Sequence, residues 1–245
     1  MLNKDQAVCI RTVDYSETSQ VATFFARQTG KISVIAKGSK RPKSSFGGPL
    51  EILTYGQIVF LQRNQSSLAT LTEFEQKPAL TNLSKNLTAL NCALFAAELL
   101  NLLTEEYDPH TQLFDSIIEF LENIQKTKKT EQMLMLLISF QLTLLTQTGF
   151  SPILNLCSNC SMPLKNSNHL YFSSSSNGLI CKDCEVSFYD KVKLTPQAAN
   201  FITNLKQLDK ADKNTLAEIE KILITHFTNL LSKPPKMAKH ILALK

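Results

Sequence analysis

The feature that most constrains this chain is a set of four cysteines arranged as two Cys-x-x-Cys pairs. Cys157 and Cys160 form the first pair, and Cys181 and Cys184 form the second, with twenty residues between the pairs. A two-residue gap lets a tight turn direct both thiolates to one point, so two such turns complete a tetrahedral, all-sulfur metal site. Four protein ligands leave no open coordination position. The spacing therefore predicts one structural Zn²⁺ ion and not a catalytic one.

Disulfides and an iron or redox site are the alternatives to zinc for these cysteines. Disulfides are disfavoured because the first residues are polar and lack the apolar core of a signal peptide, which places the chain in a reducing cytosol. Sequence does not separate zinc from iron or a redox site, since four thiolates suit both metals. His169 lies between the pairs and could replace one thiolate, but with four cysteines present we expect a surface loop residue. Cys9 and Cys92 lie in apolar surroundings and are expected to be buried.

Length and charge set the broad class of protein. A chain of 245 residues with 43% hydrophobic content can bury a sizeable core in one large domain or two ordinary ones. The most apolar run, residues 133–145, is too short to span a bilayer and is expected to be a buried helix. Residues 1–80 carry ten Lys/Arg against six Asp/Glu, residues 81–150 four against eight, and residues 151–245 twelve against seven. The middle is therefore acidic and both ends are basic.

Six basic residues and no acid fall within the seventeen residues 27–43. They are Arg27, Lys31, Lys37, Lys40, Arg41 and Lys43. Such a cluster is usually only a solvated face, but beside strands and glycines it is also the pattern of a site for a phosphate backbone. The residues alone leave both interpretations open.

The hydrophobic pattern changes from strands to helices near residue 82. Five short segments rich in β-branched and aromatic residues come first, and five strands suit a small closed barrel. We expect these strands at residues 8–13, 20–25, 32–36, 50–61 and 67–74. Apolar spacing of three and four then predicts helices. We expect them from about 82 to 102, from 109, from 130 to 149, from 196, and around 216–231, where Pro234-Pro235 ends the last.

The sequence therefore predicts an α+β multidomain protein. A barrel domain occupies residues 1–80 and a helical domain residues 81–245, with a zinc module inserted between helices at about 151–190. The serine run Ser173–Ser176 is expected to form a hairpin tip inside that module. The chain contains no GxxxxGK[ST], GxGxxG or HExxH motif, and its four histidines lack acid partners at ligand spacing. We therefore expect no catalytic residues and no enzyme activity.

An ordered series of motifs near the start of the chain resembles the bacterial RecO recombination mediators. The series comprises Tyr15-Ser-Glu-Thr-Ser19, Gly30-Lys31, Ala36-Lys37-Gly38 and the run from Arg41 to Glu51, ahead of a helical region that carries the four-cysteine insertion. The resemblance implies an N-terminal OB-fold, a helical domain with a zinc module, and an ATP-independent protein that binds single-stranded DNA. Proteins of this family anneal complementary strands, including strands coated by single-stranded DNA-binding protein (SSB), and act with RecR to help RecA load. The resemblance also implies a cytoplasmic, nucleoid-associated bacterial protein.

Carried over by position, the resemblance implies a set of DNA contacts on the barrel. The expected phosphate contacts are Lys37, Lys40, Arg41 and Lys43, with Arg27 and Lys31 at the edge of the groove. Phe46 and Tyr55 are candidate platforms for base stacking, although such aromatics are as often core residues.

The C-terminal segment departs from the family pattern. Residues 232–240 carry lysines and two prolines where RecO-like chains tend to have an arginine-rich helix, so the DNA or SSB contacts expected there are less defined. Two other functions compete with the mediator. A zinc-containing adaptor would use the basic segment only as a solvated face. A zinc-dependent nucleic-acid enzyme is disfavoured by the closed four-thiolate site.

Overall fold

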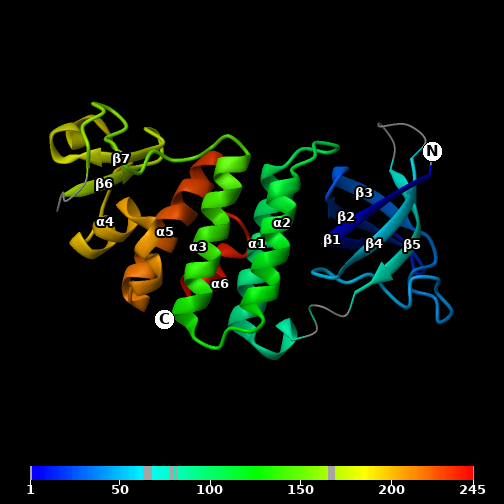
Figure 1. Ribbon diagram of the computed structural model, residues 1–245. Coiled ribbons are helices and arrows are strands. Elements are labelled where there is room, and N and C mark those ends of the chain that lie inside the picture. Colours follow the sequence, from blue (N-terminus) through cyan, green and yellow to red (C-terminus); the bar gives the residue numbers. More distant parts are fainter. Residues whose placement is uncertain (1, 63–67, 78–79, 81, 165–168, 245) are drawn as a thin grey trace. The chain divides into compact units, whose positions relative to one another are not determined.

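A computed structural model of the chain describes residues 2–62, 68–77, 80, 82–164 and 169–244. The chain divides into two compact units, residues 1–126 and 127–245, which we call unit 1 and unit 2 and describe separately. Unit 1 contains a β-barrel and two long helices. Unit 2 contains two long helices, two short α-helices and a small sheet (Figure 1), and it carries the cysteine pairs.

Five strands close into a barrel in the order β1-β2-β3-β5-β4. They are β1 (Leu2–Asp14), β2 (Gln20–Ala26), β3 (Gly30–Ala36), β4 (Tyr55–Leu61) and β5 (Ala69–Gln76). β1 pairs antiparallel with both β2 and β4, and β3 pairs parallel with β5, which closes the sheet. A five-stranded barrel with this strand order is the arrangement of an OB-fold. The expected five-stranded barrel is confirmed.

The barrel interior is filled by alternate side chains of these strands. Along β3, buried and partly buried residues alternate at every position, as a strand with one face on a core requires. The rings of Phe24 and Phe74 meet edge to face with centroids 5.2 Å apart. Cys9 also lies in this core, and burial raises the pKa of its thiol to about 12, partly offset by the Arg11 backbone. Cys9 and the fully buried Cys92 are therefore small core residues, as expected.

All five strands differ in extent from the expected ranges. The strand expected at 8–13 runs from Leu2 to Asp14, and those expected at 20–25 and 32–36 are one or two residues longer. The strand expected at 50–61 begins only at Tyr55, because residues 50–54 form a turn in which Leu53 has a positive φ of 70°. The strand expected at 67–74 runs from Ala69 to Gln76. Its expected first residue, 67, lies outside the described residues.

The helices of unit 1 are joined by a segment that packs against the barrel. After the short 3₁₀ helix η2 (Leu83–Lys85) come α1 (Leu87–Leu103) and α2 (Thr111–Ile124). Between α1 and α2, the Tyr107 N–H donates to the Lys31 carbonyl at 2.9 Å and Ser33 Oγ donates to Glu106 at 2.6 Å. Gly30 has a φ of 78°, and a Cβ there would lie 2.2 Å from the Asp108 carbonyl oxygen. Only glycine allows this approach, so the connection is fastened to the start of β3.

Unit 2 is built around α3 and α5, with the cysteines in an insertion between helices. Its helical elements are α3 (Thr130–Gln147), α4 (Pro196–Thr203), η4 (Leu205–Lys210), α5 (Lys213–Leu230) and α6 (Ala238–Leu242). The cysteine module, residues 151–194, lies between α3 and α4 and contains β6 (Leu170–Ser173), β7 (Gly178–Cys181), η3 (Lys182–Ser187) and β8 (Val192–Lys193). β6 and β7 form a hairpin, so the serine run is a hairpin tip, as expected.

The helix starts follow local sequence signals. The Thr195 hydroxyl accepts a hydrogen bond from the Ala198 N–H, with Pro196 in the first turn, and Asp212 caps α5 in the same way through Thr215. In the part of the chain that the structure describes, no helix is long and apolar enough to cross a membrane.

Candidate metal centre and nucleic-acid surface

The four cysteines of the module converge on one point. Their Sγ atoms all lie within 4.8 Å of one another, and those of Cys160 and Cys181 are 3.9 Å apart. Sulfurs held by a tetrahedral metal at about 2.3 Å lie roughly 4 Å apart, so the observed spacing fits a four-thiolate site. Among the described residues, this group contains only cysteines, and His169 is exposed. The four cysteines can therefore hold a metal ion.

Hydrogen bonds and crowding around the sulfurs also suit a cation. The Cys181 N–H donates to the Cys157 sulfur at 3.4 Å, and the Asn159 amide donates to the Cys184 sulfur at 3.3 Å. Burial raises the pKa of Cys157, but donors from Cys160, Cys181 and Asn159 outweigh it and lower the value to about 6. Asn159 favours the Cys184 thiolate, yet burial and the three neighbouring thiols raise its pKa to about 12. Four thiolates repel one another, and a bound dication removes that repulsion.

Neighbouring backbone holds the two cysteine turns together. Ile153 bridges to Gly178 at the start of β7, and a Cβ on Gly178 would lie 2.4 Å from the Ile153 carbonyl oxygen. Ser158, between the first two cysteines, donates through its N–H at 2.8 Å and its hydroxyl at 3.0 Å to the Leu179 carbonyl. The first cysteine turn is thus fixed to the strand that carries the third cysteine.

The basic loop, residues 37–49, connects β3 to the segment before β4 and presents its cations outward. Lys37, Arg41 and Lys43 are exposed, whereas Lys40 is partly buried and pairs with Asp14 at 2.8 Å. Three consecutive turns shape the loop, with N–H groups of residues 41, 44 and 47 donating to carbonyls of residues 38, 41 and 44 at 3.1–3.3 Å. The loop thus carries three exposed positive charges on a defined backbone. This arrangement suits a phosphate chain.

Buried polar contacts anchor the base of the basic loop. Gln20 accepts hydrogen bonds from Ser39 Oγ at 2.9 Å and from the Leu50 N–H at 2.8 Å, and its amide donates to the Leu50 carbonyl. The side chain of Phe46 is only 5% exposed and packs in the barrel core. The two ends of the loop are therefore tied to one buried glutamine, and its middle is plugged by one aromatic ring. As its ring is covered, Phe46 serves packing here and does not offer a stacking face.

Arg27 and Lys31 lie at the opposite end of β3 from the basic loop. Seven residues of strand separate the two ends, a span of about 20 Å. Arg27 makes a two-point ion pair with Asp115 of α2, with both N···O distances 2.9 Å. Lys31 Nζ donates to the carbonyls of Asn101, at 2.8 Å, and Thr104 at the end of α1. The cluster that is continuous in sequence is thus divided in space, and these two cations have partners within the protein.

Tyr55 lies in a groove whose lining carries charges of both signs, with Arg27 and Lys77 as its cations. The groove has a volume of about 450 Å³ and runs between the barrel and α2, where it is lined by Asp115, Glu119 and Glu122. The Tyr55 ring lies 6.3 Å from that of Phe114 and 4.9 Å from Lys77 Nζ. The three carboxylates outnumber the two cations, and Arg27 is already paired with Asp115, so the groove is a poor continuation of the basic loop for a phosphate chain.

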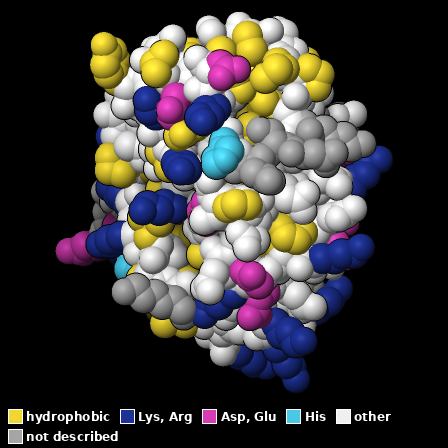
Figure 2. Space-filling view, turned by 90° about the vertical axis from the view of Figure 1, so that its left-hand side faces the viewer, with side chains coloured by type: hydrophobic (Ala, Val, Ile, Leu, Met, Phe, Trp, Pro, Cys, Tyr) yellow, Lys and Arg dark blue, Asp and Glu magenta, His cyan; other side chains and the backbone are white. Residues whose placement is uncertain are grey.

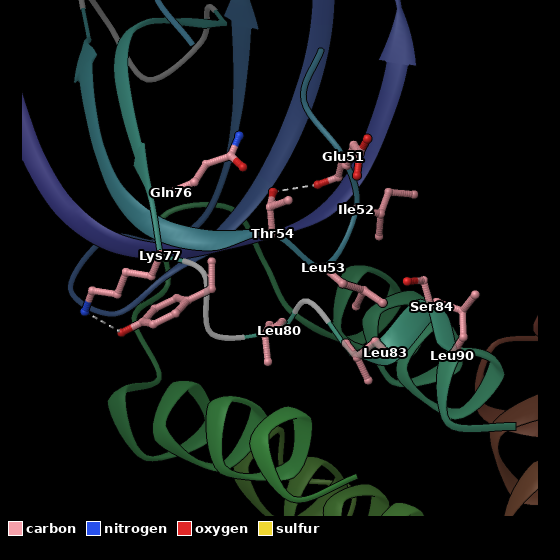
Figure 3. A pocket seen from close by; sticks show the side chains of 11 residues that line it. Glu51, Ile52, Leu53, Thr54, Gln76, Lys77, Leu80, Leu83, Ser84 and Leu90 are labelled. Carbon is pink, nitrogen blue, oxygen red and sulfur yellow. Dashed lines mark hydrogen bonds between the residues drawn. The ribbon is translucent and has the colours of Figure 1, made fainter. Parts of the chain in front are cut away.

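A larger cavity of about 530 Å³ lies beside the same end of the barrel. Figure 3 shows its apolar floor, which Leu53, Leu83 and Leu90 supply, and its rim, where Lys77 bonds to Tyr55 at 3.4 Å. Glu51 and Lys77 give that rim one charge of each sign. The cavity therefore has no charge preference for phosphate.

Sequence reasoning missed one exposed aromatic near the basic loop. Tyr15 is 65% exposed, and it begins the turn whose Ser19 hydroxyl accepts from the Gly38 N–H at 3.1 Å. In the same turn the Thr18 carbonyl accepts from the Lys40 N–H, also at 3.1 Å. The available signal was a tyrosine at the start of a polar turn between two strands, which does not reveal the contact with residues 37–40.

Comparisons with known proteins agree with this architecture. The family model described as "Recombination protein O N terminal" matches residues 1–78, and the one described as "Recombination protein O C terminal" matches residues 84–239. Among curated relatives, "DNA repair protein RecO" of Bacillus pumilus (strain SAFR-032) is 27% identical over all of this chain and 96% of its own length. Its namesake from Bacillus subtilis (strain 168) is 28% identical over 93% of this chain and 89% of its own.

A third relative carries the same name. "DNA repair protein RecO" of Rhodopirellula baltica is 31% identical over 74% of this chain and 66% of its own length. The N-terminal match covers the barrel, and the C-terminal match covers the helices and the cysteine module, so both halves of the architecture agree with one family. The chain belongs to the RecO family of recombination proteins, whose role lies in DNA repair and recombination.

Proposed function

We propose that this protein is a recombination mediator that binds single-stranded DNA and anneals complementary strands without nucleotide hydrolysis. The observation that carries the proposal is the anchored basic loop, with Lys37, Arg41 and Lys43 exposed on the barrel of a RecO-family chain. OB-fold barrels bind single strands through a basic surface that follows the phosphates and through aromatic rings on which bases stack. Tyr15, on the adjoining turn, has an exposed ring and is the proposed stacking residue.

Charge screening is the physical basis of the proposed annealing. Two complementary strands repel each other along their phosphates, and a cationic surface that holds one strand reduces this repulsion. If the bases of the held strand stay accessible, the second strand pairs with a target whose local concentration is raised. None of these steps requires ATP or a catalytic residue, and we propose a non-enzymatic protein.

We propose that the cysteine module binds one structural Zn²⁺ ion. The convergent sulfurs of Cys157, Cys160, Cys181 and Cys184 support four-thiolate coordination. A bound zinc ion would supply no chemistry beyond holding these turns together, because all four positions are taken by protein ligands.

The family suggests partners in the same pathway. We propose that the protein acts on SSB-coated strands and, with RecR, assists RecA loading in the bacterial cytoplasm at the nucleoid. Pull-down of SSB and of RecR by the purified protein tests these contacts independently of annealing.

A strand-pairing assay tests the proposed function. Two complementary oligonucleotides, one with a donor and one with an acceptor dye, are mixed with the protein, with and without ATP and with and without SSB. We expect faster pairing than in buffer, unchanged by ATP and retained when SSB coats the strands. Strict dependence on ATP, or no acceleration over the protein-free reaction, would remove the mediator function.

The second candidate function is a zinc-containing adaptor without annealing activity. The observation that favours it is that three of the predicted DNA contacts, Arg27, Lys31 and Lys40, bond within the protein. Fluorescence anisotropy with labelled single strands separates the two functions, since an adaptor of this kind leaves the anisotropy unchanged.

A further inference from the structure

A cavity of about 490 Å³ opens in unit 2, where the cysteine module meets the C-terminal half of α5. The module contributes Phe188 and Tyr189, which follow η3, and part of the serine turn, residues 173–177. The helix contributes His226 and Asn229. Neither the metal site nor the basic loop takes part in this cavity.

Tyr189 is the most exposed large hydrophobic side chain in the described part of the chain. Its relative exposure is 103%, compared with 76% for Val186 on the same segment. Hydrophobic side chains gather at the upper edge of the view in Figure 2, over the cysteine module, with Lys and Arg side chains below them. A ring held out in solvent at the mouth of a cavity is free to stack with a planar ligand.

Behind the lining of the cavity, the ring of His226 is fully covered. The residue is 0% exposed, and neither ring nitrogen has a partner of hydrogen-bond geometry among the described residues. The ring of Phe172 meets it edge to face at 5.3 Å. Burial lowers the pKa of His226, outweighing the nearby Phe150 backbone, which favours the charged ring. The covered imidazole therefore supports the wall of the cavity, and the exposed Asn229 beside it offers the polar groups that a ligand can reach.

The rim of the cavity carries a carboxylate, that of Asp190, which hydrogen bonds hold in place and which repels anions. Asp190 accepts hydrogen bonds from Ser173 Oγ at 2.7 Å and from the N–H and Oγ of Ser175, both at 2.8 Å. The lining contains this carboxylate but no Lys or Arg. A free phosphate or an acidic peptide is therefore disfavoured, whereas a neutral, planar group with donors and acceptors on its edge is not.

A second cavity, which adjoins the first, is lined in part by lysines. Asn229 lines both this cavity and an adjoining one of about 800 Å³, whose lining includes Lys236 and Lys239. A ligand with a neutral planar part in the first cavity and a negative backbone across the second would meet matching chemistry in both. A nucleotide within a single strand has these two parts.

We propose that this cavity binds one base of a single-stranded nucleic acid, stacked on Tyr189 with its polar edge toward Asn229, and with the adjoining phosphates toward Lys236 and Lys239. The inference rests on the proposed single-strand function and adds a base-reading contact in unit 2, separate from the phosphate contacts of the basic loop. The stacking contact does not depend on the identity of the base, since every base has a π face.

The test compares a strand that has bases with one that has none. Anisotropy is measured with a labelled oligothymidine and with an abasic oligonucleotide of the same length and charge. We expect Tyr189→Ala to weaken oligothymidine binding about five-fold or more and to leave abasic binding unchanged. Tyr189→Phe retains the ring and should bind like the parent. Val186→Ala, exposed on the same segment but outside the cavity, is the matched control and should also bind like the parent.

The outcomes separate this inference from the proposed function. If the parent protein binds neither oligonucleotide, both proposals fail. If the parent binds oligothymidine but Tyr189→Ala binds it equally well, or loses both ligands equally, only the base-binding inference is overturned. Displacement of oligothymidine by excess thymidine monophosphate would assign the cavity to free nucleotides and overturn the strand assignment.

Photocrosslinking places the base directly. An oligonucleotide with one 5-iododeoxyuridine is irradiated with the full chain and the product is digested with trypsin. We expect a crosslink in the peptide Asp183–Lys191, which contains Phe188 and Tyr189. Crosslinks confined to the barrel, with none in this peptide, would contradict the inference.

Discussion

One acidic side chain of this protein, that of Glu220, is buried with only part of its hydrogen-bonding capacity used. Glu220 of α5 is 2% exposed, and one of its carboxylate oxygens accepts from the Gln141 amide of α3 at 2.7 Å. Its other oxygen has no hydrogen-bond partner among the described residues. Burial raises the pKa of Glu220 to about 8, with the Gln141 hydrogen bond opposing the shift. At neutral pH the folded protein therefore favours the protonated acid.

The raised pKa of Glu220 predicts a pH-dependent stability. The unfolded chain releases this proton near pH 4.3, whereas the folded chain holds it up to about pH 8, so stability falls as pH rises between these values. We expect Glu220→Gln, which keeps a neutral side chain of the same shape, to stabilise the protein at pH 8 by on the order of 3 kcal/mol and to change little at pH 5. Urea denaturation at both pH values measures this.

The control for this prediction is an exposed glutamate. Glu119→Gln on α2 should leave the difference between pH 5 and pH 8 as in the parent. Equal stability of Glu220→Gln and the parent at pH 8 would show that the Glu220 carboxyl is solvated in solution.

Lys31 and Lys37 stand at the two ends of one strand and have different partners. Lys31 Nζ bonds to the last carbonyls of α1, which a helix otherwise leaves without intrahelical donors, while Lys37 is exposed at the start of the basic loop. Burial lowers the pKa of Lys31, and Glu105 and Glu106 oppose this.

These environments predict opposite effects for the same substitution at the two lysines. Lys31→Met removes a charged donor to two carbonyls and should lower the free energy of unfolding by about 1–3 kcal/mol without changing the salt dependence of DNA binding. Lys37→Met should leave stability unchanged and weaken DNA binding. Thermal unfolding and anisotropy on both variants check this. A loss of DNA affinity by folded Lys31→Met, larger than that of Lys37→Met, would move the contact to the other end of the barrel.

At the scale of elements, the basic loop is a charged surface with a buried base. Gln20, Ser39 and Leu50 bond to one another under the loop, and Phe46 occupies the core below it. Because these anchors point inward, the exposed cations can be replaced without removing what shapes the loop. The contribution of charge to DNA binding is thereby separable from that of loop structure.

Removal of the exposed loop charges should flatten the salt dependence of DNA binding. For single strands, the slope of log affinity against log salt is about −0.7 per phosphate neutralised. We expect the triple change Lys37→Ala, Arg41→Ala and Lys43→Ala to reduce the slope by about 2 units. Anisotropy titrations across a series of salt concentrations measure it.

A matched triple variant controls for net charge. Lys126, Lys128 and Lys129 are three exposed lysines in the turn between α2 and α3. Their replacement by alanine removes the same charge from another surface and should leave the slope nearly unchanged. Equal effects of the two triples would mean that binding responds to net charge alone.

At the scale of the whole molecule, the chain consists of two units that each carry a distinct site. The basic loop belongs to residues 1–126, and the four clustered cysteines belong to residues 127–245. Each unit has its own buried residues, so loss of the metal is expected to affect unit 2 first.

Removal of metal ligands should separate the two units functionally. The purified protein is expected to contain about one zinc per chain. Cys157→Ser together with Cys160→Ser should release the metal and lower the thermal stability of unit 2, while salt-dependent DNA binding by the barrel is retained in part. Elemental analysis and anisotropy measure these outcomes. Cys9→Ala with Cys92→Ala, two buried cysteines outside the site, should retain the metal; absence of metal from the parent, purified without chelator, would contradict the prediction.

Local sequence determined much of what is seen here because its signals act over short distances. The two-residue gap in each cysteine pair, the alternation along β3, and the caps at Thr195 and Asp212 each involve neighbours a few residues apart. The barrel, the order of helices and the convergence of the four cysteines could therefore be predicted from the sequence. The strand expected from residue 50 began late because the positive φ of Leu53 has no local signal in a leucine.

The partners of individual side chains were decided only by the tertiary structure. Arg27, Lys31 and the basic loop are continuous in sequence, but the β2–β3 hairpin sends them to opposite ends of a strand, where α1 and α2 supply carbonyls and a carboxylate. Likewise, Tyr189 and His226 come together only through the packing of the cysteine module on α5. Such contacts join residues about 40 to 90 positions apart, and no periodicity or spacing reports them, because they depend on how finished elements pack and not on how each one forms.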